Sequence, residues 1–177
     1  MTLLFNRFPK REEILPVFGS LVFVVFSWSI RGFLYIVPSL ILRHSVGETL
    51  SVLCYMLAFA LLESLLLMSG GVLVSMFLPR KWFLEGFTYK GFIALLVFTI
   101  ALIVLQNNLT NVLPPVDILY LGFAISIAVM VALFFLSDKV TVFRKALLAI
   151  AERLQVFVYI YVPLGMVGIL VVIFRNL

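Results

Sequence analysis

The sequence of 177 residues has little of the polar chemistry on which most soluble enzymes depend. It contains one cysteine, Cys54, and one histidine, His44. A single cysteine excludes a disulfide within the chain, a CxxC redox pair and a cysteine-rich metal site. A single histidine likewise excludes a bis-histidine haem and a histidine-rich metal centre within one chain.

Charged residues are also scarce. They make up 12% of the chain, whereas hydrophobic residues make up 64%. A soluble domain carries about 25% charged and about 45–50% apolar residues, so this composition cannot cover a globular surface with polar groups. The composition therefore excludes a soluble enzyme, a nucleic-acid-binding protein and a disordered linker. The solvent of this chain must be lipid.

The known short motifs of catalysis are missing as well. The sequence has no glycine-rich nucleotide-binding loop, no HExxH, no Gly-x-Ser-x-Gly and no paired aspartate motif. Glu63 and Asp117 are the acidic residues close to the hydrophobic runs, and they lie at different depths. General acid–base catalysis needs two groups within reach of one substrate. We therefore expect no catalytic residues, no cofactor and no metal.

The long hydrophobic runs predict an all-α, polytopic transmembrane bundle. A helix needs about 20 apolar residues to span a bilayer, so five crossings nearly exhaust the chain and leave one integral membrane domain, residues 1–177. The expected spans are approximately 14–37, 49–78, 91–109, 116–136 and 156–174.

Two details of these spans are left open by the sequence. Residues 32–42 either continue the first helix to about Val37, or lie at the outer interface or re-enter the membrane. The second apolar stretch exceeds the hydrocarbon thickness, so it must tilt, break near Ser69-Gly70-Gly71 or expose one end.

Residues 138–155 predict an amphipathic helix, because apolar residues recur there at three- and four-residue spacing. Its other positions carry a basic face formed by Lys139, Arg144, Lys145 and Arg153. Such a helix binds the cytoplasmic leaflet through its basic residues, or it docks a partner protein.

The placement of the remaining charges predicts the orientation. Ten basic residues fall on one side of the five spans, against Arg43 and Arg175 on the other. The ten are Arg7, Lys10, Arg11, Arg80, Lys81, Lys90, Lys139, Arg144, Lys145 and Arg153. Because basic residues favour the cytoplasmic side, we expect a cytoplasmic N-terminus and an outside C-terminus in the plasma (inner) membrane.

Glu63 is the sharpest candidate for a functional site. It lies near the middle of the second span, where a charged side chain costs about 2.5–3.5 kcal/mol on insertion scales. It is either a proton relay, cation site or counter-charge, or a protonated or hydrogen-bonded group that specifies helix packing. Because Ala60, Gly70 and Gly71 lie near it at helical spacing, we expect it to face protein. Arg31 is its candidate partner, unless that side chain snorkels to the outer head groups.

Small residues on the second span predict close helix contacts. Ala60 with Ser64, and Gly71 with Ser75, are small-xxx-small pairs, which let helices approach closely. On the fifth span, Gly165 and Gly168 weakly resemble such a pair, although only two residues separate them. The contacts are expected either within the chain or between subunits.

Three hypotheses for function remain. The first is a non-catalytic membrane subunit or scaffold, acting in a homo-oligomer or with other membrane subunits and with no nucleic acid as partner. The second is a small oligomeric transporter or channel with Glu63 at the midplane and Ser69-Gly70-Gly71 as its gating element. The third is a lipid-modifying enzyme that uses Arg31, His44 and Glu48 at the outer surface.

Overall fold

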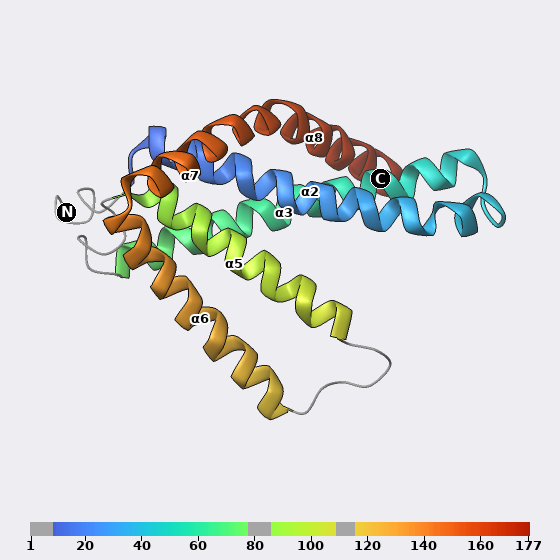
Figure 1. Ribbon diagram of the computed structural model, residues 1–177. Helices are drawn as coiled ribbons and strands as arrows, with labels where there is room; N and C mark the ends of the chain where they lie inside the picture. Colours follow the sequence, from blue (N-terminus) through green and yellow to red (C-terminus); the bar gives the residue numbers. More distant parts are fainter. Residues whose placement is uncertain (1–8, 78–85, 109–115) are drawn as a thin grey trace.

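The computed structural model describes residues 9–77, 86–108 and 116–177 (Figure 1). Within these residues all the regular structure is helical, and five stretches are long and apolar enough to cross a membrane. The helices are α2 (Arg11–Ile41), α3 (Val46–Phe77), α5 (Phe87–Asn108), α6 (Val116–Lys139), α7 (Thr141–Leu154) and α8 (Val156–Asn176). The prediction of an all-α transmembrane bundle with an additional amphipathic helix is confirmed.

The two longest helices answer both questions that the sequence left open. α2 continues to Ile41 through Pro38, so residues 32–41 belong to the first helix. α3 runs without interruption through Gly70 and Gly71 to Phe77, so a break near these glycines, one of the three alternatives, is not present. Glycine keeps its backbone N–H, and the helical hydrogen-bond ladder therefore continues across it.

Three helices, α2, α3 and α8, pack along one another and form the main bundle. The backbones of α3 and α8 approach each other closely at Gly168. A Cβ atom there would lie 2.7 Å from the carbonyl oxygen of Cys54 and 3.1 Å from the backbone nitrogen of Ala58. Only glycine leaves room for this approach of the two backbones.

The core of this bundle is apolar and aromatic. Phe26 of α2 is fully buried and packs in one cluster with Leu57 and Leu61 of α3. Its ring stacks on Tyr161 of α8 with the two centroids 4.9 Å apart. A stacked pair of this kind adds packing energy to the burial of the two rings.

α7 crosses one end of the bundle, which we call the basic end because Arg11, Lys90 and Lys139 lie there. Part of the apolar side of α7 is covered by protein, since Leu147 and Ala151 are buried in a second cluster with residues of α5. The opposite end, which carries the α2–α3 turn and the C-terminus of α8, is called the far end (Figure 1).

The α5–α6 hairpin is attached to the rest of the molecule at the basic end. There α5 lies beside α2, and a Cβ atom on Gly91 would sit 3.1 Å from a methyl carbon of Val17. Towards the far end the hairpin diverges from the main bundle (Figure 1). In the most hydrophobic 18-residue stretch of α6, no residue is buried. The hairpin therefore exposes a large apolar surface at membrane depth.

Candidate functional site

Glu63 lies close to the middle of the membrane crossing of α3. Near the far end, Tyr55 of the same helix accepts a hydrogen bond from the side-chain amide of Asn176 in the last turn of α8. At the basic end α3 terminates at Phe77. With a rise of 1.5 Å per residue, Glu63 is about 12 Å from Tyr55 and about 21 Å from Phe77 along the helix.

The Glu63 side chain is exposed on the surface of the chain. Its neighbours one turn away are apolar and exposed too: Phe59 is 65% exposed, Leu66 70% and Leu67 47%. The expectation that Glu63 faces protein is wrong for this single chain. Ser64 is directed into the core, and adjacent residues are separated by about 100° around a helix. We call the exposed surface around Glu63, formed with Phe59, Leu66 and Leu67, the Glu63 face.

The candidate pair between Arg31 and Glu63, which was the alternative to a snorkelling Arg31, is not formed among the described residues. Arg31 is exposed, and its guanidinium lies 5.5 Å from the ring centroid of Trp28 in a cation–π contact. Gly32 is level with Met56 of α3, since a Cβ on the glycine would lie 3.7 Å from the methionine's terminal methyl carbon. Glu63 is therefore about 10 Å deeper than Arg31, by the rise per residue.

The small residues of α3 divide into two groups. Ala60, Ser64 and Ser75 are buried, and the hydroxyl of Ser64 donates to the carbonyl oxygen of Ala60 at 2.7 Å. Ser69 and Gly71 are exposed. A Cβ on Gly70 or Gly71 would meet nothing within 4 Å. The first pair therefore lies at a helix contact within the chain, whereas the glycines leave an open surface on α3.

The basic residues of the amphipathic segment all lie at the surface: Lys139, Arg144, Lys145 and Arg153 are exposed. The helix does not offer its whole apolar side to lipid, because Leu147 and Ala151 are buried against the protein. Basic side chains remain free to approach a membrane surface or a partner protein.

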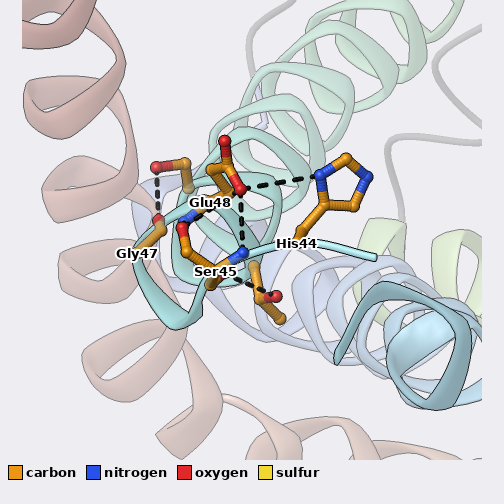
Figure 2. A network of polar contacts seen from close by, with 6 residues as sticks. His44, Ser45, Gly47 and Glu48 are labelled. Carbon is orange, nitrogen blue, oxygen red and sulfur yellow. Dashed lines mark hydrogen bonds and ion pairs between the residues drawn. The ribbon is translucent and has the colours of Figure 1, made fainter. Parts of the chain in front are cut away.

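At the far end, His44 and Glu48 form a polar network with the start of α3 (Figure 2). The backbone N–H of Ser45 donates to Glu48 Oε2 at 2.8 Å, and His44 Nδ1 lies 3.6 Å from the same oxygen. The Ser45 hydroxyl in turn accepts from the N–H of Glu48 at 3.4 Å. This reciprocal pair is a capping box, which fixes where α3 begins.

An open pocket of about 430 Å³ adjoins this network, and its lining includes His44, Glu48 and Tyr55 together with Arg175 and Asn176 of α8. Arg31, which the sequence had suggested as a third member of an outer site with His44 and Glu48, does not line it. The arginine beside this pocket is Arg175, contributed by the C-terminal turn of α8.

At the basic end, Asp138 joins α6 to the first turn of α5. The hydroxyl of Tyr89 donates to Asp138 Oδ1 at 2.7 Å, and Lys90 Nζ lies 3.5 Å from Asp138 Oδ2. The Lys90 side chain is only 4% exposed, so this ion pair is partly shielded from water. Arg144 of α7 places its guanidinium 5.9 Å from the centroid of the Tyr89 ring.

The same end is tied to α2. Thr88 Oγ1 donates to the carbonyl oxygen of Glu13 at 3.3 Å. Four helices, α2, α5, α6 and α7, thus contribute to an open pocket of about 500 Å³. Its polar lining includes Glu13, Lys90, Asp138 and Arg144.

The sequence places Lys90 among the basic residues of a loop and assigns no role to Asp138. One signal for the cluster was present: a lysine begins one arm of a helical hairpin and an aspartate ends the other, so both fall at the same end. No such signal places Arg175 at the far-end pocket, because its position there depends on how α8 packs on α3.

Comparison of the chain with protein-family models, curated proteins and solved structures gives no match. Among the described residues, no three His, Cys, Asp or Glu side chains gather as a metal site would require.

Proposed function

We propose that the protein is a non-catalytic membrane subunit whose Glu63 face is covered by a transmembrane helix of another chain. The observation that carries this proposal is the position of Glu63 at mid-depth on an exposed, otherwise apolar face. A charged side chain in hydrocarbon costs about 2.5–3.5 kcal/mol on insertion scales. Contact with a polar group of a neighbouring helix offsets that cost.

The surface around Glu63 suits such a contact. Gly70 follows Glu63 by seven residues, which is close to two helical turns, so both lie on one side of α3. A Cβ at Gly70 would have open space around it. A partner helix can therefore approach the α3 backbone there closely, as small residues allow in membranes. The partner is a second copy of this chain or another membrane subunit.

The proposal includes an orientation. The basic end, with Arg11, Lys90 and exposed Lys145, is placed in the cytoplasm of a cell whose plasma (inner) membrane holds the chain, because basic residues are retained on that side. The C-terminus then lies outside. A cysteine replacing Arg43 should react with a membrane-impermeant maleimide on intact cells, and one replacing Lys145 should react only after the cells are opened.

Cysteine cross-linking in native membranes tests the subunit contact. In a Cys54→Ala background, Leu66→Cys places a thiol on the Glu63 face, and Ile160→Cys places one on exposed α8. Gly165 is level with Leu61 in the antiparallel α3–α8 pair, so residue 160 lies at nearly the depth of residue 66. Leu66→Cys should form covalent adducts of higher mass with a bifunctional maleimide, and Ile160→Cys should not.

Glu63 itself is then replaced in the Leu66→Cys chain. Glu63→Leu should lower the cross-linked fraction by at least roughly fivefold, since it removes one hydrogen bond of a charged group. Glu63→Gln keeps a polar side chain and should lower it less. Equal cross-linking at residues 66 and 160, or cross-linking unchanged by Glu63→Leu, would contradict the proposal.

An oligomeric transporter is the alternative that the mid-depth carboxylate favours, because ionisable groups at this depth also mark ion pathways. The two functions separate in proteoliposomes. A transporter should show an ion flux that Glu63→Gln abolishes while the Leu66→Cys adduct still forms. A scaffold should show no flux above that of empty liposomes.

A further inference from the structure

We propose that the pocket at the basic end binds a phosphoethanolamine group, with Arg144 holding the phosphate and Glu13 holding the ammonium. This binding site is separate from the Glu63 face, and it stands whether or not the chain is a subunit of a larger complex. Its volume of about 500 Å³ lies in the range of about 300–1,000 Å³ that is typical of ligand pockets.

The location of the pocket matches the head-group layer. Its residues come from the first turns of α2 and α5, the last turn of α6 and the first two turns of α7. Three of these helices are membrane spans that begin or end at this level. Because these spans begin or end at the membrane surface, we expect lipid head groups to lie beside the pocket.

The charges at the pocket select a zwitterionic ligand. Lys90 and Asp138 lie 3.5 Å apart and balance each other. Among the residues that the structure describes, the lining also holds the cation Arg144 and the anion Glu13. A ligand that carries one anion and one cation on adjacent groups complements both.

Glu13 supplies the distinguishing observation. Its side chain is half-buried in the pocket, and in the part of the chain that the structure describes its carboxylate has no hydrogen bond or ion pair. A half-buried carboxylate gains from a cationic partner that also donates hydrogen bonds. A primary ammonium donates, whereas the trimethylammonium of choline has no N–H.

Arg144 supplies the phosphate contact. Its guanidinium carries five N–H donors in a planar fork that matches phosphate geometry. The contact with the Tyr89 ring positions that fork at the pocket, and the side chain remains exposed. The far-end pocket lacks this arrangement, because its carboxylate, Glu48, already accepts from the backbone and hydroxyl of Ser45.

Native mass spectrometry of the purified chain in micelles tests the proposal. Phosphatidylethanolamine, phosphatidylcholine and phosphatidylglycerol are added singly and in competition, and the bound fraction of each is measured. We expect the ethanolamine lipid to bind roughly tenfold more tightly than the other two, the value of one charge-assisted hydrogen bond. Equal binding of the three lipids would overturn the proposal.

Two variants with neighbouring controls locate the site. Arg144→Gln should weaken binding of all three lipids, whereas Lys145→Gln, at the adjacent exposed position, should not. Glu13→Gln should remove the preference for ethanolamine, whereas Glu12→Gln should keep it. If Arg144→Gln fails to fold, Arg144→Lys keeps the charge but loses the fork and should still weaken binding. A preference that survives both pocket variants would refute the site.

Competition with a soluble compound shows whether the phosphoethanolamine group comes from a bilayer lipid or from a free molecule. Glycerophosphoethanolamine should displace bound lipid from the wild-type chain if the head group alone is recognised. If it fails to compete at millimolar concentration while the lipid preference stands, the bilayer lipid is the ligand and its acyl chains contribute. Displacement at micromolar concentration assigns the pocket to the free water-soluble compound.

Discussion

Alanine in place of Gly19 would collide with the backbone where α7 meets α8. Its Cβ would lie 2.5 Å from the Cα atom of Gln155 and 2.9 Å from the carbonyl oxygen of Leu154. Ordinary contact begins at 3.4 Å, so the first distance falls 0.9 Å short. Backbone atoms cannot rotate away as a side chain can, and α2 must therefore move off the junction.

The magnitude follows from two opposing effects. Inserting a methyl group into a packed core costs about 1–3 kcal/mol, and the upper part of that range applies to a backbone collision. Replacing glycine by alanine within a helix contributes about 0.5–1 kcal/mol in the other direction. Gly19→Ala should therefore lower the free energy of unfolding by about 2 kcal/mol. Gly168→Ala, with a nearest distance of 2.7 Å to Cys54 O, should lower it somewhat less.

Two open glycines provide the control. A Cβ at Gly70 or Gly122 would meet nothing within 4 Å, so alanine there should raise stability by about 0.5–1 kcal/mol. Unfolding is followed in mixed micelles with increasing SDS by near-ultraviolet circular dichroism, which reports tertiary packing. If Gly19→Ala is as stable as the parent, or is stabilised like Gly70→Ala, α2 does not press on the α7–α8 junction and the reasoning fails.

Three further substitutions test the polar contacts at the two ends. Tyr89→Phe removes the hydroxyl that donates to Asp138 and should lower stability by about 1.5–3 kcal/mol in the same SDS titration, because the acceptor is charged; an unchanged midpoint would contradict that bond. Asp138→Asn should destabilise the protein more than Lys90→Met does. It removes the negative charge beside a lysine that is only 4% exposed, whereas the aspartate left by the second substitution is 47% exposed. The reverse order of the two destabilisations would show that Lys90 is not the buried partner of this ion pair. Ser45→Ala breaks the capping box with Glu48 and should speed amide hydrogen exchange in the first turn of α3 alone, without shifting exchange at the far turns.

The helices followed from sequence because each depends on local chain properties. Apolar run length predicted every span to within a few residues, and residues 138–155 were recognised by their periodicity as the amphipathic α7. The end of α2 was not predictable, because Pro38 usually disfavours a continuing helix. The continuity of α3 through Gly70 and Gly71 stayed open in the sequence, because two adjacent glycines weaken a helix without excluding it.

The candidate site was predicted less well. Glu63 was identified from its depth, since charge in an apolar run is visible in the sequence, but its exposure depends on which side of α3 packs on α2 and α8. Whether Arg31 pairs with Glu63 stayed open in the sequence, because the register between helices is set by contacts such as Gly32 with Met56 and Gly168 with Cys54.

The sequence by itself determined that this chain lives in lipid, that it is helical, and approximately where each helix crosses. These properties follow from composition and periodicity, which act residue by residue. Only the tertiary structure decided that Asp138 meets Tyr89 and Lys90, that Glu13 and Arg144 line one pocket, and that Glu63 is exposed. Those relations join residues far apart along the chain, and they depend on the relative rotation and depth of packed helices, which no local pattern encodes.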